Sequence, residues 1–175
     1  MTPLFKSTHD ALRFAYNYSG LAVAQTRYGS VPAGDSKGLG GYNGAAEAGH
    51  IQQVVSEAGK LMESLITAKY ATPAHPRWHD AVAYAALAVS DDVLPHVEMR
   101  LTGVYVTVYY AGIDIQDATL ARILGIHRST VGTHRKKVHA YLRGTRHQQG
   151  MDALAYETVD RLLTDKGIVG NENND

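Results

Sequence analysis

The sequence predicts an all-α protein: a multi-helix bundle whose C-terminal part holds two short helices joined by a tight turn, then one more helix. Apolar residues recur at intervals of three and four along most of the chain, the spacing of a half-buried helix. Glycine and proline gather between these periodic stretches. The 175 residues, 45% hydrophobic and 19% charged, have the composition of a folded domain. We expect an N-terminal helical portion over residues 1–95 and a C-terminal portion over residues 96–175.

Composition also bears on the compartment. No run of about 18 apolar residues is present, so no membrane span is expected. The first residues lack the apolar stretch of a signal peptide. The chain has no cysteine, which excludes disulfides and thiolate metal sites. A cytoplasmic protein is the expectation.

The first expected helix begins near Ser7 or Thr8, either of which can cap it, and Gly20 is expected to interrupt it. Its apolar face is formed by Ala11, Leu12, Ala15 and Tyr18. Residues 28–44 contain six glycines and are expected to form a loop. Within it, residues 34–38 superficially resemble a phosphate loop but lack the Gly-Lys-Ser/Thr order, so a flexible connection is the favoured interpretation.

Residues 45–70 are predicted to form a single helix, and residues 78–89 another that is rich in alanine. Between them, Thr72, Pro73 and Pro76 break the chain. His75 and His79 are four residues apart, a spacing that can place two metal ligands on one helix face. Pro76 disfavours a regular helix there, and no carboxylate completes a known pattern. No metal or other cofactor is therefore expected.

Residues 101–110 allow two interpretations, because Val104, Val106 and Val108 alternate as in a strand. A helix is favoured, since the segment leads directly into the helix pair. Residues 151–166 carry one apolar stripe, and Gly167 can end that helix. The stripe is also a possible homodimer contact. Residues 170–175 are polar and expected to be disordered.

The formal net charge is +0, but the charges are unevenly distributed. Residues 118–151 contain no Asp or Glu and seven Lys or Arg residues. The rest of the chain has ten basic residues against 17 acidic ones. A basic block in an otherwise acidic protein is typical of a protein that binds a polyanion with one part of its surface, although a solvated basic face gives the same pattern.

The segment Asp117–Lys136 has the residue pattern of a helix-turn-helix. Ala121 is small where the first helix presses on the second, and Gly125 permits a positive φ at the turn four residues later. The shared core is predicted to contain Leu120, Leu124, Ile126 and Val131. This pattern predicts a second helix over residues 128–142 whose N-terminal part enters the major groove of double-stranded DNA.

Candidate DNA-binding side chains lie on this second helix. Arg128 can bond a guanine with two hydrogen bonds, whereas the cluster of residues 135–137 is better suited to phosphate. The candidates for base edges and phosphates are His127, Arg128, Ser129, Thr130, Thr133, His134, Arg135, Lys136 and Lys137.

Two residues depart from the usual pattern of the motif. His127 stands where Ser or Thr commonly caps the second helix, so we expect either a weak cap or a helix start shifted to Ser129. Gly132 lies inside the helix, at a cost of about 1 kcal/mol relative to alanine. It either lets the backbone approach DNA closely or marks a tolerant position.

From about Val97 to Gly144, the chain resembles region 4 of bacterial sigma factors, with a lead helix, a loop, a short helix and a long final helix. The layout is also similar to the Q-type late-gene antiterminators of lambdoid phages. That resemblance rests on the hydrophobic lead into Tyr109-Tyr110-Ala111-Gly112 and on Leu120-Ala121-Arg122-Ile123-Leu124-Gly125. Some of those proteins hold a zinc-binding cysteine segment, which this chain lacks. Residues 6–20 and 37–41 look similar to small prophage-encoded regulators.

The resemblance implies a protein that binds DNA near a promoter, loads onto paused RNA polymerase and permits terminator read-through. An operator-binding regulator of phage or bacterial origin, acting as a dimer, is the alternative. An enzyme that acts on DNA is disfavoured, because the sequence has no cysteine nucleophile and no acidic cluster for two metal ions. Asp91 and Asp92 are the only two acidic residues that are adjacent in the sequence. They lie at an expected helix end, where a solvated turn is the ordinary explanation.

Overall fold

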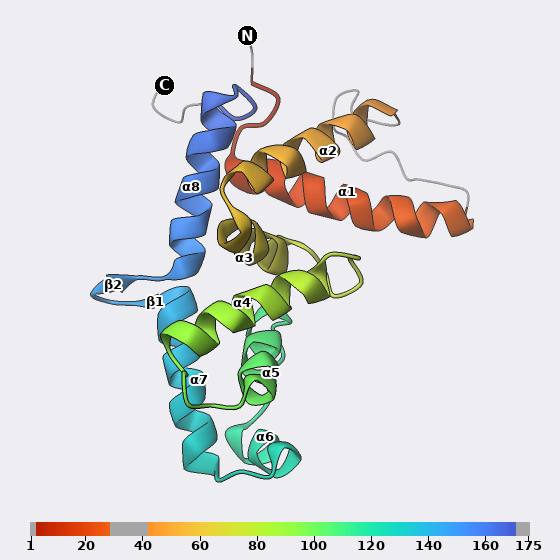
Figure 1. The fold of residues 1–175 in the computed structure, drawn as a ribbon. Helices are drawn as coiled ribbons and strands as arrows, with labels where there is room; N and C mark the ends of the chain where they lie inside the picture. Colours follow the sequence, from red (N-terminus) through yellow and green to blue (C-terminus); the bar gives the residue numbers. More distant parts are fainter. Residues whose placement is uncertain (1–2, 29–41, 171–175) are drawn as a thin grey trace.

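A computed structural model describes residues 3–28 and 42–170, which are mostly helical (Figure 1). Eight helices and one two-stranded hairpin are formed within these ranges. In chain order they are α1 (Thr8–Tyr28), α2 (Tyr42–Glu57), α3 (Lys60–Tyr70), α4 (Trp78–Asp92), α5 (Met99–Tyr110), α6 (Asp117–Leu124), α7 (Arg128–Arg143), β1 (Gly144–Thr145), β2 (Gln148–Gln149) and α8 (Met151–Asp165). The prediction of an all-α fold is confirmed, as is the helix over residues 101–110.

The helices form an elongated arrangement in which α7 and α8 follow one another along one side (Figure 1). α8 packs against α2 and α3, while α7 packs against α5 and α6 at the opposite end. α4 crosses between them and contacts both α3 and α5. Phe5 pairs with Val169 through an isolated bridge, so the N-terminal segment lies beside the end of α8.

One apolar core runs through the described part of the chain. Trp78 is 2% exposed, and its indole N–H donates to the carbonyl of Ala68 at 3.1 Å, which ties α4 to α3. Burial of the indole ring removes a large apolar surface from water while its polar atom stays bonded. The core continues to Val131, Val138 and Leu142 on α7, all at most 1% exposed. The C-terminal helices therefore share the interior of the rest of the protein.

Three predicted boundaries are wrong. α1 continues through Gly20 to Tyr28, because a single glycine weakens a helix without ending it. The predicted helix over residues 45–70 is two helices, separated at Gly59, whose φ of 89° is incompatible with helix. The predicted loop also extends too far, since residues 42–44 belong to α2. Its glycine-rich part, residues 29–41, lies outside the described residues, as do residues 171–175.

The apolar stripe of α8, considered above as a contact with a second copy, packs largely against α2 and α3 of its own chain. Ala155, Val159 and Leu163 are each 0% exposed and are covered by other helices of the same chain. These three side chains are therefore not available to a second copy, whereas Leu154 of the same stripe is 40% exposed. The homodimer stays a prediction. None of the helices in residues 3–28 and 42–170 has both the length and the apolar character needed to cross a membrane.

Candidate nucleic-acid interface

A sharp turn between α6 and α7 sets the geometry of the candidate site. α6 ends at Gly125, which has a left-handed φ of 69°, and the Ile126 N–H donates to the carbonyl of Ala121 at 3.1 Å. A left-handed residue at this position favours glycine. Leu120 and Ala121 of α6 are buried, as is Val131 of α7. The expected positive φ and these expected core positions are confirmed.

α7 begins at Arg128, with His127 as its N-cap. The Nδ1 atom of His127 accepts a hydrogen bond from the Ser129 N–H at 3.3 Å and lies 2.7 Å from the Ser129 hydroxyl oxygen. An imidazole nitrogen thus takes the place of the usual hydroxyl or carboxylate oxygen, satisfying a backbone donor that the helix leaves unpaired. The shift of the helix start to Ser129 does not occur.

Asp117, the first residue of α6, holds α7 in place. The Arg135 guanidinium donates to Asp117 Oδ1 at 2.5 Å and to the carbonyl of Ile115 at 2.8 Å. A Cβ atom on Gly132 would lie 3.0 Å from Asp117 Oδ2, so the glycine gives this carboxylate room. The structure thus supplies a reason for Gly132 that neither sequence interpretation contained: close packing against α6.

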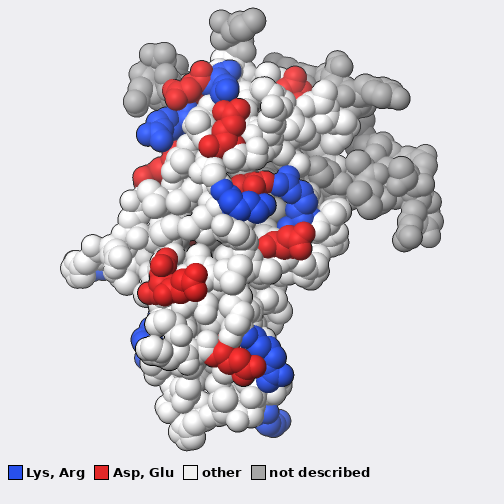
Figure 2. Space-filling model, viewed as in Figure 1, with Lys and Arg blue, Asp and Glu red and all other residues white. Residues whose placement is uncertain are grey.

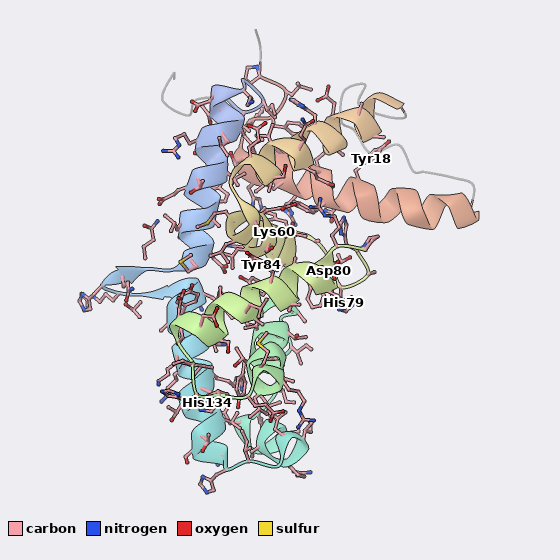
Figure 3. The ribbon with its side chains drawn as sticks, in the orientation of Figure 1. Tyr18, Lys60, His79, Asp80, Tyr84 and His134 are labelled. Carbon is pink, nitrogen blue, oxygen red and sulfur yellow. The ribbon has the colours of Figure 1, made fainter. Side chains whose placement is uncertain are left out.

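α5 packs against α7, and two tyrosines of α5 contact two histidines of α7. The His134 Nδ1 is 3.3 Å from the Tyr105 hydroxyl, and the two rings meet edge to face (Figure 3 labels His134 on α7). His139 meets the Tyr109 ring in the same way, at 5.0 Å between centroids. Burial lowers the pKa of both histidines, and neighbouring cations lower it further. Both imidazoles therefore favour the neutral form more than a free histidine does.

A buried carboxylate joins α5 to the start of α8. Asp152 is 6% exposed and accepts hydrogen bonds at 2.8 Å from the hydroxyls of both Tyr109 and Tyr110. Burial raises the pKa of Asp152, although the two tyrosine hydrogen bonds oppose that effect. Sequence reasoning missed this cluster. The adjacent tyrosines were visible, but their common partner is 42 residues or more away along the chain.

The outer face of α7 is open to solvent. A shallow groove there is lined by Arg128, Ser129, Gly132, Thr133 and Lys136 of α7, together with His127 and Asp117. These α7 positions are three or four residues apart, so they lie along one face of the helix. The groove is bounded mainly by hydrogen-bond donors and cations, with one carboxylate at its edge.

The structure divides the predicted site residues into two groups. The exposed group comprises His127, Arg128, Ser129, Thr133, Lys136 and Lys137. His134 is half-buried against α5, Arg135 is bonded to Asp117, and Thr130 is half-buried. The sequence analysis placed both groups in one site, although the helical spacing of the buried Val131, Val138 and Leu142 could have separated them.

Charge is mixed over the face of the molecule shown in Figure 2, where acidic and basic side chains alternate. At the lower end of that view, Lys and Arg side chains lie at the left and right edges, beside the helices of the basic block. On α7, Arg128, Lys136 and Lys137 are exposed and form no ion pair within the described residues. Uncompensated cations of this kind attract an anionic partner.

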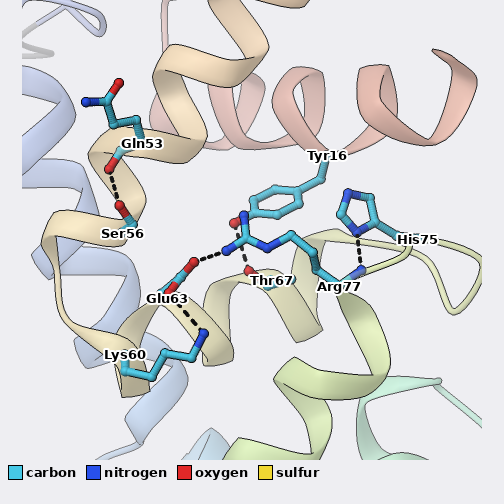
Figure 4. A network of polar contacts seen from close by, with 8 residues as sticks. All are labelled: Tyr16, Gln53, Ser56, Lys60, Glu63, Thr67, His75 and Arg77. Carbon is cyan, nitrogen blue, oxygen red and sulfur yellow. Dashed lines mark hydrogen bonds and ion pairs between the residues drawn. The ribbon is translucent and has the colours of Figure 1, made fainter. Parts of the chain in front are cut away.

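A second polar cluster lies between α3 and α4 (Figure 4). Glu63 is only 7% exposed and pairs with Lys60 at 3.4 Å and with Arg77. Arg77 also donates its backbone N–H to His75 Nδ1 at 3.2 Å. With Nδ1 accepting this bond, the neutral ring carries its proton on Nε2, so neither nitrogen of His75 offers a lone pair to a metal. His75 is also buried, whereas His79 is exposed. No group of three His, Asp or Glu side chains suited to a metal ion occurs in the described part of the chain.

Comparison with known proteins returned no match: no family model, no curated protein and no solved structure resembles this chain closely enough to count.

Proposed function

We propose that α6 and α7 form a helix-turn-helix and that the protein is a sequence-specific DNA-binding transcription regulator of the cytoplasm. One observation carries the proposal. The exposed face of α7 presents cations and hydroxyls over four turns, while its opposite face is fixed in the core by Val131, Val138 and Leu142. A helix held rigidly from behind, with a donor-rich outer face, fits the major groove of a DNA duplex.

The exposed residues divide by the chemistry of what they bind. Arg128, Ser129 and Thr133 lie near the N-terminal end of α7, where side chains meet base edges. Lys136 and Lys137 lie one to two turns further on and suit phosphate oxygens. His134 and Arg135, by contrast, keep α7 at its angle to α5 and α6. Their contribution to binding is to position the helix.

We propose a binding role without a catalytic step. The groove on α7 contains one carboxylate, Asp117, and one of its oxygens already accepts from Arg135. Hydrolysis of a phosphodiester commonly uses two metal ions held by several carboxylates, or a nucleophile beside a base. The donor-rich surface instead offers what duplex recognition requires.

The binding test uses a duplex selected from a random library by the wild-type protein, about 40 base pairs long, or nearly four helical turns. Affinity is measured at several salt concentrations. Lys136→Ala is expected to lower the slope of log K against log salt by about 0.9, because one phosphate contact is lost. The matched control is Lys6→Ala, at an exposed lysine of the N-terminal segment, which is expected to leave the slope unchanged. A folded wild-type protein without salt-sensitive affinity for duplex would remove the proposal.

The resemblance to Q-type antiterminators supplies the finer proposal, in which the DNA-bound protein loads onto RNA polymerase. Purified polymerase and a template with the selected element upstream of a terminator provide the assay. Increased read-through supports antitermination. Altered initiation without read-through supports the operator-binding regulator instead.

A further inference from the structure

The hairpin between α7 and α8 extends the exposed face of α7. β1 and β2 pair Gly144 with Gln149 and Thr145 with Gln148, which leaves Arg146 and His147 as the two residues of the turn. All five residues from 145 to 149 are exposed. In Figure 1 the hairpin projects from the junction of α7 and α8, away from α5 and α6. Its surface is thus free for a partner, and its sequence is polar and cationic.

The root of the hairpin is closely packed. A Cβ atom on Gly144 would lie 2.5 Å from the Gly150 nitrogen, and one on Gly150 would lie 2.2 Å from the carbonyl carbon of Arg143. The Gly144 N–H also donates to the carbonyl of Ala140, within α7. Gln149 donates to Glu157 of α8 at 2.6 Å. These contacts fix the turn relative to α7, so a partner that binds it meets a preorganised element.

The distance along the α7 axis shows where the hairpin lies when α7 is in the major groove of a duplex. Ser129, Lys136 and Arg143 are seven residues apart, so they lie on nearly the same face of the helix. With a rise of 1.5 Å per residue, Gly144 lies roughly 16 Å beyond Thr133. A major groove is about 12 Å wide. When α7 enters the groove by its N-terminal end, with its axis across the groove and Thr133 inside it, the hairpin lies beyond the groove edge, where the sugar–phosphate backbone runs.

The charges around the hairpin also favour a phosphate backbone as its partner. No carboxylate occurs from residue 118 to residue 151, and neither Arg143 nor Arg146 forms an ion pair within the described residues. Glu157, which is near the hairpin, is engaged by Gln149. An exposed guanidinium on a fixed turn presents several N–H donors in a plane, the geometry that binds phosphate oxygens.

We propose that the hairpin is a second DNA-contacting element, in which Arg146 binds a backbone phosphate outside the groove that α7 enters. The inference rests on the proposed function, because it extends the footprint of the same protein on the same duplex. It predicts an asymmetric footprint, longer on the side toward which the C-terminal end of α7 points. Arg143, at the end of that face, binds the backbone between the two contacts.

The test compares the wild-type protein with Arg146→Ala on the selected duplex, using hydroxyl-radical footprinting and the salt dependence of affinity. Arg146→Ala is expected to shorten protection at one end only. It is also expected to lower the salt slope by about 0.9, so that the affinity lost between about 50 and 200 mM salt shrinks by about 3.5-fold. The matched control is Arg161→Ala, at an exposed arginine of α8 outside the hairpin, which is expected to change neither quantity.

A second variant separates charge from folding of the turn. Arg146→Lys keeps the cation and is expected to restore the slope and most of the protection. If Arg146→Ala retains the wild-type footprint and slope while the wild-type protein binds duplex, the hairpin inference is wrong and the proposed function stands. If the wild-type protein itself does not bind duplex, both fail.

Discussion

At the scale of single residues, the side chains of α7 differ in what surrounds them more than in type. Arg128 and Arg135 are both arginines on one helix, yet Arg128 is exposed and Arg135 donates to Asp117 and to the Ile115 carbonyl. A guanidinium that is already paired contributes to the angle between the helices. One that is free can bind a base or a phosphate. The sequence predicted that both arginines contact DNA, Arg128 at a base edge and Arg135 at phosphate, and the pairing of Arg135 with Asp117 was not foreseen.

Arg128→Ala separates recognition of a base from attraction to phosphate. We expect it to weaken binding of the selected duplex by about 1–3 kcal/mol and to relax preference at one base pair. Lys137→Ala is expected to weaken all duplexes similarly, since a phosphate contact carries no sequence information. Affinities for a set of single-base variants of the duplex measure both effects. An equal loss at every variant for Arg128→Ala would place this side chain on phosphate.

The burial of His75 is expected to make the free energy of unfolding depend on pH. Burial lowers its pKa, as does Arg77, so the folded protein holds His75 neutral. Below about pH 6.5, the ordinary pKa of histidine, the unfolded chain takes up a proton that the folded chain does not. The contribution of neutral His75 to the free energy of unfolding is therefore fully present above that pH. It is lost as the pH falls toward the lowered pKa of His75 in the folded protein.

His75→Asn isolates this effect, because an asparagine oxygen can still accept from the Arg77 N–H but does not titrate. We expect the variant to lose less of its free energy of unfolding than the wild type when pH falls from about 7 to 5. Urea unfolding at each pH measures the difference. His134 and His139 act in the same direction in both proteins. Parallel pH profiles would show that His75 is not held neutral.

At the scale of elements, glycine has opposite effects in the turn and inside a helix. Gly125 ends α6 with a φ of 69°, and Gly103 lies within α5; a Cβ atom on either would meet nothing within 4 Å. Gly125→Ala is expected to lower the free energy of unfolding by about 1–2 kcal/mol, because alanine is strained there. Gly103→Ala is expected to raise it by about 0.5–1 kcal/mol, through helix propensity. Denaturant unfolding of the two variants is the measurement, and effects of the same sign would contradict the account.

Periodicity in the sequence predicted most helices but not all of their ends. The spacing of apolar residues identified α7 and α8, because their buried faces are regular over several turns. The break at Gly59 was missed, since the apolar pattern continues across it from α2 into α3. The hairpin was missed because strands of two residues are too short to show alternation. The sequence placed His127 at the cap position and left open whether the helix start shifts to Ser129, because imidazole is not among the usual capping groups.

At the scale of the whole molecule, packing decides which surfaces remain for partners. The stripe on α8 showed that a face is buried, but a pattern does not say by what. Its cover is α2 and α3, whose contact with α8 is remote in sequence. The exposed face of α7 was predictable, because its basic residues and its buried residues alternate at helical spacing. Its relation to the hairpin required the structure.

Mapping of backbone amide resonances tests the central claim most directly, since it reports which surface meets the duplex. On addition of the selected duplex, we expect the largest shifts at Ser129, Thr133 and Lys136, and small shifts across the α3–α4 cluster around Glu63. Shifts centred on α4 or α8, with α7 unchanged, would contradict the claim that the outer face of α7 binds DNA.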